Sequence, residues 1–403
     1  MFASGMPPKI NGLHKLPTTC IEDCCTSEYI MDIKPYLKFM VDKNASDIFF
    51  ITGVPVHIRV NGPCISVGDA VMQSASLKKL AYSIMNDSQI KEFEADHDYS
   101  FAISVAGLGR FRFNIFKQRG DVAIVVRYIL DDIPTVESLQ LPAVLTDLVM
   151  KSRGLILVVG TAGSGKSTTL AAMIEHRNIN TTGHILTIEN PIEYFYKSKK
   201  SIMSQRELGQ DFLSYESALR KAVRLAPDVV MVGEICDQNS MQHVISYAES
   251  GRLCLSSLHA SNAIQAIDRI TNLFPSSFHG QIMIDLSLNL SAIITQRLIC
   301  GKAGGIVPAV EVMVVNSYIS ELISKGKYQD IKVAMEQGAL QGMQTFDQAL
   351  FILYKEGKIT FEETLRYADS RNNLSLRIKM SESRFIQDNS KGQHGKHESH
   401  HGK

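Results

Sequence analysis

The sequence has almost no net charge, no long hydrophobic run and no signal-like leader. Its 403 residues carry a formal charge of +1, which provides no basic field for nucleic acid. No apolar stretch approaches the roughly 18 residues that a membrane span requires, so membrane association is expected only through a partner. The first thirty residues contain Glu22 and Asp23 among prolines and lack an apolar core, which disfavours a secretory signal. The expected compartment is the cytoplasm.

Cysteine and histidine are present but do not form a recognisable metal motif. The seven cysteines are an odd number, and four of them are scattered singly, which is typical of a reducing compartment. Cys20, Cys24 and Cys25 cluster without a second ligand pair, so a zinc site is disfavoured. The polar tail 381–403 is predicted to be disordered. It holds four of the twelve histidines, which leaves weak binding of a transition metal open.

One motif dominates the chain. The apolar run Leu155–Val159 leads directly into a G-x-x-x-x-G-K-[ST] pattern. A buried strand that feeds a glycine-rich turn and a helix start aims backbone N–H groups at nucleotide phosphates. The nucleotide-binding loop comprises Gly160, Thr161, Ala162, Gly163, Ser164, Gly165, Lys166, Ser167 and Thr168. Lys166 is expected to contact the β- and γ-phosphates and to act in the transition state, and the Ser167 hydroxyl is expected to hold Mg²⁺. The motif predicts a P-loop that binds ATP or GTP.

Three later strand-like runs end in ionisable side chains. They are residues 185–188, followed by Glu189 and Glu193, residues 229–232, followed by Glu234, and residues 253–257, followed by His259. Ligands of an open parallel sheet sit beyond the carboxyl ends of its strands, so Glu189, Glu193 and Glu234 are expected to converge on the γ-phosphate. For His259, a phosphate-sensing role and an ordinary structural role are equally open.

The hydrophobic patterns predict two domains and two extensions. Residues 1–30 show no periodicity and are expected to be a mobile extension, with Met31 as a possible alternative start. Short β-rich runs with turn residues between them predict a small α+β domain over 31–132. Alternating strands and helices predict an α/β domain with a mostly parallel sheet over 133–380. In its later half, 277–299 is interpreted as one long amphipathic helix.

Together, these motifs resemble the secretion ATPase superfamily, in particular the type IV pilus retraction ATPases of the PilT/PilU family. The resemblance extends from about Met31 to Met380. It rests on the P-loop, the acidic box 189–193, the segment 204–207 and the boxes around Glu234 and His259, with runs 283–290 and 342–350 more similar to PilU than to PilT members.

The resemblance implies an overall α/β fold, with a RecA-like P-loop NTPase domain after a smaller PAS-like α+β domain. It implies ATP and Mg²⁺ as cofactors and a homo-hexamer in which the N-terminal domain of one subunit closes over the nucleotide of its neighbour. It assigns Glu193 as the catalytic glutamate and Glu234 as the Walker B glutamate acting on Mg²⁺ and water. His259 is the histidine-box residue, and Arg112 and Arg127 approach the γ-phosphate. From the residues alone, both arginines are more simply interpreted as exposed strand residues.

The predicted function is a cytoplasmic ATP-hydrolysing motor that powers pilus retraction and twitching motility. The implied partners are a PilT-like retraction ATPase, to which this chain is accessory, and a platform protein at the inner-membrane base of the pilus. One departure is that the usual Glu-Asp-Pro of the acidic box is Glu189-Asn190-Pro191 here. The lost carboxylate leaves open a weakly hydrolysing subunit that docks on or regulates another pilus or type II secretion ATPase. A soluble P-loop kinase is disfavoured, because no small-substrate pocket signature accompanies the loop.

Overall fold

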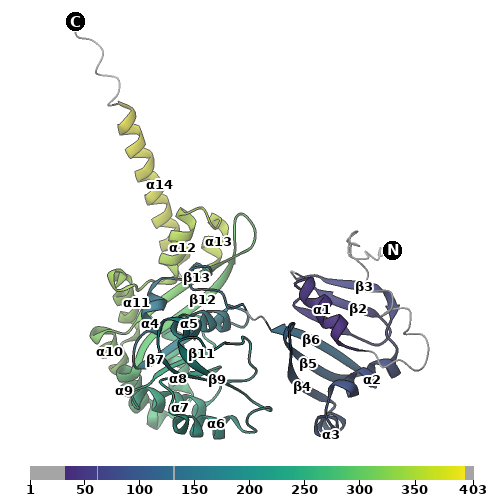
Figure 1. The fold of residues 1–403 in the computed structure, drawn as a ribbon. Helices are drawn as coiled ribbons and strands as arrows, with labels where there is room; N and C mark the ends of the chain where they lie inside the picture. Colours follow the sequence, from purple (N-terminus) through teal and green to yellow (C-terminus); the bar gives the residue numbers. More distant parts are fainter. Residues whose placement is uncertain (1–31, 61, 130–131, 395–403) are drawn as a thin grey trace. The chain divides into compact units, whose positions relative to one another are not determined.

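The computed structural model describes residues 32–60, 62–129 and 132–394. It divides into two compact units, each with its own sheet and core (Figure 1). Of the described residues, those before 133 together with Glu193–Phe195 form the first unit, and the others form the second. The predicted N-terminal extension and its three clustered cysteines lie outside the described residues. Within those residues, no helix combines the length and apolar character needed to cross a membrane.

The first unit is a six-stranded antiparallel sheet with three helices. Its strand order is β3-β2-β1-β6-β5-β4. Its elements are α1 Lys34–Asp42, β1 Asp47–Phe50, β2 Pro55–Arg59, β3 Cys64–Val71, α2 Ser74–Ile84, α3 Asp87–Asp96, β4 Asp98–Val105, β5 Gly109–Gln118 and β6 Asp121–Ile129. On β5, Phe111, Phe113 and Ile115 are buried and the intervening Arg112 and Asn114 are partly exposed. This period of two gives the sheet one core face and one polar face.

The second unit contains a seven-stranded sheet in the order β13-β12-β7-β11-β10-β8-β9, in which all neighbours are parallel except β12 and β13. Its strands are β7 Gly154–Val159, β8 Gly183–Glu189, β9 Ser201–Glu207, β10 Val229–Val232, β11 Leu253–Leu258, β12 Leu290–Cys300 and β13 Ile306–Val314. Its α-helices are α4 Val144–Val149, α5 Lys166–Asn180, α6 Tyr215–Ala222, α7 Gln238–Glu249, α8 Ala263–Asn272, α9 His279–Asn289, α10 Ser317–Ser324, α11 Tyr328–Gln337, α12 Phe346–Lys355, α13 Phe361–Tyr367 and α14 Arg371–His394.

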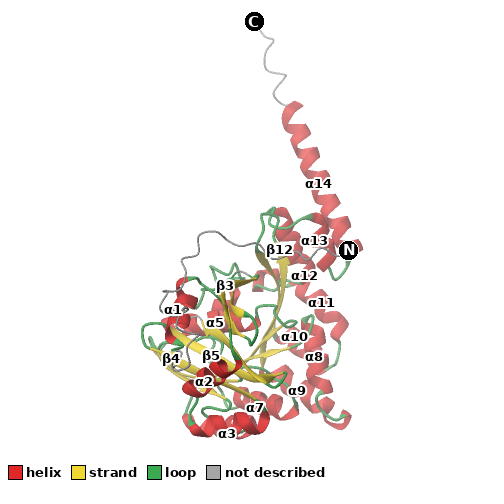
Figure 2. Ribbon diagram, turned by 90° about the vertical axis from the view of Figure 1, so that its right-hand side faces the viewer, coloured by secondary structure: helices red, strands yellow, loops and turns green. Residues whose placement is uncertain are grey.

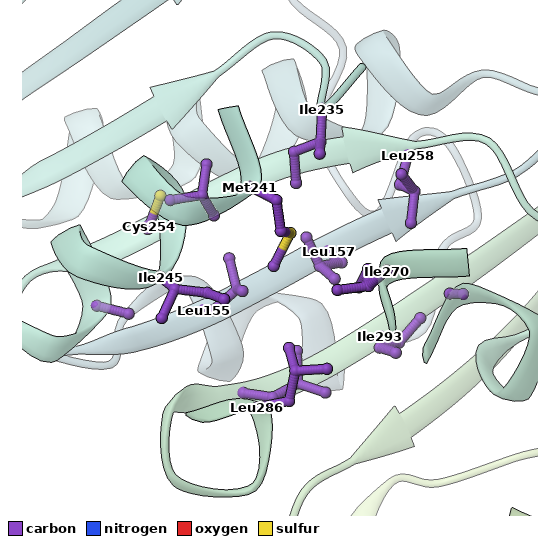
Figure 3. Packing of buried hydrophobic residues seen from close by; sticks show 14 of the residues in the cluster. Leu155, Leu157, Ile235, Met241, Ile245, Cys254, Leu258, Ile270, Leu286 and Ile293 are labelled. Carbon is purple, nitrogen blue, oxygen red and sulfur yellow. The ribbon is translucent and has the colours of Figure 1, made fainter. Parts of the chain in front are cut away.

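The core of the second unit forms where helices cover the central strands. Every residue of β7 is buried, as expected for a parallel strand covered on both faces. Figure 3 shows Met241 and Ile245 of α7 against Leu155 and Leu157 of β7, in one cluster of buried side chains. Each such side chain contributes about 1.5–3 kcal/mol by leaving water, so the strand that carries the P-loop is firmly anchored.

The prediction of one long helix over 277–299 is wrong. The helix α9 ends at Asn289, and β12 begins at Leu290. The strand pairs in parallel with β7 and antiparallel with β13, and most of its residues are buried. A strand buried on both faces shows no alternation of apolar and polar residues, so its periodicity cannot be separated from that of a buried helix.

The prediction of a disordered tail from residue 381 also differs from the structure. The helix α14 continues through His394 and projects from its unit (Figure 1 and Figure 2). No proline interrupts residues 381–394, so the helix can propagate although the segment has no apolar periodicity. The other three tail histidines lie outside the described residues.

Glu311 of β13 is a buried carboxyl group next to a helix terminus. Its Oε1 accepts a hydrogen bond from the backbone N–H of Ala263, the first residue of α8, at 2.7 Å. Burial raises the pKa of Glu311 to about 7, and the hydrogen bond from Ala263 opposes this rise. Asp369 raises the pKa further, while Arg297 lowers it. The folded protein therefore favours the neutral carboxyl group.

We predict that Glu311→Gln changes the pH dependence of stability. A folded pKa above the unfolded value favours folding below the unfolded pKa, and this contribution disappears as pH rises through about 7. Between the unfolded and the folded pKa, the free energy of unfolding of the wild type should fall by up to about 1.4 kcal/mol per pH unit relative to that of Glu311→Gln, whose amide cannot ionise. Urea unfolding of both proteins between pH 5 and 8 measures this difference. Parallel curves would contradict it, and the exposed Glu249→Gln serves as a control.

Candidate active site

The P-loop connects the end of β7 to the start of α5, in the middle of the parallel sheet. Its close packing requires glycine at two positions. A Cβ atom on Gly160 would lie 2.2 Å from Ser164 Oγ and 2.7 Å from the backbone oxygen of Gln296. Gly165 has a φ of +89°, and a Cβ atom there would lie 2.7 Å from Gln296 Nε2. The loop thus presents its backbone at the N-terminus of a 15-residue helix, a favourable position for phosphate.

A cavity of about 340 Å³ opens beside this loop. The P-loop forms one wall, and residues from β12, the segment after β11 and the end of α13 form the others. The lining residues are Gly160, Thr161, Ala162, Gly163, Ser164, Ala260, Ser261, Gln296, Arg297, Leu298 and Tyr367. This volume lies within the range of small-ligand pockets.

The ammonium group of Lys166 is held by its own loop. The residue is 9% exposed, and Nζ donates to the backbone oxygens of Gly160 at 3.1 Å and Thr161 at 3.0 Å. It also lies 3.3 Å from His259 Nδ1. Phosphate oxygens carry a formal negative charge and are stronger acceptors for an ammonium group than neutral carbonyls. A bound triphosphate can therefore draw Lys166 away from the loop carbonyls.

His259 connects Lys166 to Glu234. Its Nε2 lies 2.7 Å from Glu234 Oε1, and its Nδ1 lies 3.2 Å from the backbone oxygen of Gly160. Nδ1 therefore faces both a donor, Lys166 Nζ, and an acceptor, the Gly160 carbonyl oxygen, and which of the two it bonds depends on whether Nδ1 carries a proton. Lys166, His259 and Glu234 thus form a polar chain from the P-loop to the end of β10, which we call the lysine–histidine–glutamate chain.

The strand order explains this contact. β11 lies next to β7 and leads to His259, and β10 lies next to β11 and leads to Glu234. β8 is three strands from β7, a lateral distance of about 14 Å at normal strand spacing. At its end, Glu189 is buried and accepts hydrogen bonds from Thr187 at 2.6 Å and Gln205 at 3.3 Å.

The convergence of Glu189, Glu193 and Glu234 on the γ-phosphate stays a prediction. The contacts of Glu234 lead to the P-loop, whereas the described hydrogen bonds of Glu189 lie within β8 and β9. Glu193 is exposed in the loop after β8 and groups with the first unit. Its catalytic role remains a prediction.

Tyr215 lies behind the two strand ends. Its hydroxyl group donates to the backbone oxygen of Ile188 at 3.4 Å. Burial raises the pKa of Tyr215, and the nearby carboxylates of Glu189 and Glu234 raise it further. The phenol is therefore neutral and donates its hydrogen bond close to Glu189 and Glu234.

Two side chains of β12 belong to the site and were missed by the sequence analysis. Gln296 Oε1 accepts a hydrogen bond from Thr169 Oγ1 at 2.6 Å, which ties the first turn of α5 to β12. Arg297 donates to the backbone oxygens of Ser261 and Tyr367. Its guanidinium carbon also lies 3.8 Å from the centroid of the Phe346 ring. Because this segment was interpreted as helix, no sequence signal placed either residue at the P-loop.

The two predicted arginines lie in the first unit. Arg112 of β5 and Arg127 of β6 are directly opposite each other in the strand register. The Arg127 side chain is 58% exposed. Their approach to a nucleotide remains a prediction.

The chain is similar to several known proteins in sequence and in structure. The sequence model of the family described as Type II/IV secretion system protein matches residues 26–366. The chain is 45% identical to the type IV pilus ATPase PilU of Pseudomonas aeruginosa over 351 residues, which cover 87% of this chain and 92% of that protein. It is 38% identical to the pilus retraction ATPase PilT of the same organism over 344 residues, covering 85% and 100% of the two chains.

A solved structure of the pilus retraction motor PilT with bound ADP superposes on this chain with a TM-score of 0.80. The two are 39% identical, and the match covers 85% of this chain and 99% of that one.

We predict that His259→Ala lowers ATP turnover at least about tenfold while nucleotide affinity changes little, because the ring joins Lys166 to Glu234 and not to the base or ribose. Phosphate release and binding of a fluorescent nucleotide separate the two effects. His243→Ala, on α7 of the same unit, is the matched control. Unchanged turnover in a folded His259→Ala protein would show that the histidine is only structural.

Proposed function

The chain belongs to the Type II/IV secretion system protein family, and on that premise we propose that it is an ATP-hydrolysing hexameric motor for type IV pilus retraction. The PilT/PilU family predicted from the motifs is confirmed by the matches to both proteins. The observation that carries the proposal is the lysine–histidine–glutamate chain, because it joins the phosphate-binding loop to a carboxylate at the neighbouring strand ends.

In the proposed reaction, the triphosphate lies on the P-loop against the N-terminus of α5. Lys166 contacts the β- and γ-phosphates, and its charge becomes most valuable as the transition state develops. When bound, Mg²⁺ would neutralise charge on the transferring phosphoryl group. The Ser167 hydroxyl and the Glu234 carboxylate suit this cation, because Mg²⁺ prefers oxygen ligands and takes few of them from the protein.

The acidic residues have separate proposed roles. Glu234 acts near the metal and the attacking water, and its contact with His259 couples it to the position of Lys166. Glu193 is proposed as the catalytic glutamate, supplied from its exposed loop after β8. The amide of exposed Asn190, which replaces the usual aspartate, cannot act as a base.

A ring is proposed because Arg112 and Arg127 lie in a separate unit from the P-loop. Guanidinium groups from a neighbouring subunit can bind the γ-phosphate in a bidentate manner and complete the site. ATP binding and product release then move one unit against another, so that the cycle performs mechanical work on the pilus assembly. We place the ring in the cytoplasm at the inner-membrane base of the pilus, working with a PilT-like motor and a platform protein.

Asn190 favours a second candidate function. A subunit that binds nucleotide but hydrolyses it poorly could regulate another pilus or type II secretion ATPase by docking onto it. Phosphate release by the purified chain, alone and with a PilT-like partner, separates the two. The motor hydrolyses ATP in its own ring, whereas the docking subunit changes only its partner's rate.

We predict that Lys166→Ala subunits alone are inactive, that Arg127→Ala subunits alone keep only a small residual kcat, and that mixing the two restores activity well above this residual level. At a mixed interface, the Arg127→Ala subunit supplies an intact P-loop and the Lys166→Ala subunit an intact arginine. Phosphate release is measured across mixing ratios, with mixed rings verified by native mass. A mixture of Lys166→Ala with the Lys166→Ala/Arg127→Ala double variant is the control, because neither component has an intact P-loop. Absence of recovery in verified mixed rings would contradict the shared site.

A further inference from the structure

A row of charged side chains crosses the polar face of the first unit's sheet. In the strand register, Asp47 of β1 is paired with Arg59 of β2 on one side and Arg127 of β6 on the other. Arg127 is in turn paired with Arg112 of β5. Directly opposed residues of antiparallel strands point to the same face, so these four side chains form one row, which we call the arginine row.

Asp47 is the buried member of this row. Its side chain is 4% exposed, whereas Arg59 and Arg127 are 39% and 58% exposed. Oδ1 accepts a hydrogen bond from Arg127 Nε at 2.9 Å. Oδ2 accepts one from the Ser46 hydroxyl at 2.9 Å and a longer one from Arg59 Nη1 at 3.4 Å. The carboxylate is therefore held on both oxygens.

Arg59 fixes the far side of the carboxylate. Its guanidinium group also stacks on the ring of Phe49, 5.1 Å from the ring centroid. A cation held by a ring and a carboxylate has few alternative rotamers. Arg59 thereby fixes the position of the Asp47 carboxylate that Arg127 contacts.

The contact with Arg127 has a directional consequence. Asp47 binds the inner nitrogen, Nε, so the two terminal NH₂ groups extend beyond the carboxylate on a largely exposed side chain. Those two groups form the fork that matches phosphate oxygens. Two arginines directly opposite each other also repel, and a buried carboxylate beside one of them offsets that repulsion.

We propose that Asp47 is a positioning residue, which holds the guanidinium group of Arg127 by Nε so that its terminal fork is presented to the γ-phosphate. This inference rests on the proposed function, in which Arg127 acts on a nucleotide. Asp47 does not contact the nucleotide. By holding the side chain in one conformation, Asp47 reduces the conformational entropy that Arg127 loses when it binds the transition state. Its effect should therefore appear in kcat, and only when Arg127 is present.

The test is a double-mutant cycle between Asp47→Asn and Arg127→Ala in the full chain. Asparagine keeps the size of the side chain but loses the charge that holds Nε. In an otherwise wild-type background, Asp47→Asn should lower kcat about tenfold, with KM for ATP and ring assembly nearly unchanged. In the Arg127→Ala background, it should lower the residual kcat less than about twofold. Asp121→Asn, a carboxylate of the same unit that accepts a hydrogen bond from Ser74, is the matched control.

The outcomes separate the inference from the proposed function. Equal losses in both backgrounds would show that Asp47 acts independently of Arg127 and overturn the inference. Wild-type kcat for Asp47→Asn, combined with an impaired Arg127→Ala, would overturn the inference and leave the proposed function standing. Wild-type kcat for Arg127→Ala itself would overturn both.

A second variant covers the case in which Asp47→Asn does not fold. Arg59→Gln leaves the Asp47–Arg127 hydrogen bond in place but removes the anchor of the carboxylate. We expect a smaller loss of kcat, about threefold, that again disappears in the Arg127→Ala background. A loss that persists there, or no loss in a folded Arg59→Gln protein, would count against the positioning role.

Discussion

The site depends on the buried ammonium group of Lys166, which lies against the backbone of its own loop. A charge that is 9% exposed requires strong partners, and two loop carbonyls with His259 supply them. The tight packing of Gly160 against Ser164 and Gln296 gives the loop the shape that makes these contacts possible. His259 also contacts Glu234. A movement of Lys166 towards a phosphate would therefore change the contacts of the residue that follows β10.

This arrangement gives a physical basis for a motor. Work requires two conformations that bind the nucleotide with different affinities, so that binding and release drive the change between them. The P-loop and the arginine row belong to separate compact units. In the proposed ring, a nucleotide bound by both units has a higher affinity than one bound by the P-loop alone. In the proposed reaction, breaking the bond to the γ-phosphate removes the group that the arginines bind. Hydrolysis therefore releases one unit while the other still holds the product.

The fold and much of the site were predictable from the sequence wherever a pattern has one physical cause. The P-loop, the apolar strands before Glu234 and His259, and the two arginines on β5 and β6 are found in the predicted elements. Strand order is not encoded locally, so the two strands that separate β8 from β7 could not be foreseen. The buried strand β12 has no alternation, and its interpretation as helix concealed Gln296 and Arg297. The pairing of Asp47 with two arginines depends on register, which only the folded sheet reveals.

Retraction of single labelled pili against a calibrated load tests the central claim most directly. The comparison uses cells whose PilT-like partner is catalytically inactive and whose copy of this chain is wild type, deleted or Lys166→Ala. If this chain is an accessory ATP-driven motor, wild-type cells retract under load, and the Lys166→Ala strain behaves like the deletion, because a ring that cannot hydrolyse ATP cannot cycle. Full retraction force in the Lys166→Ala strain would contradict the motor role.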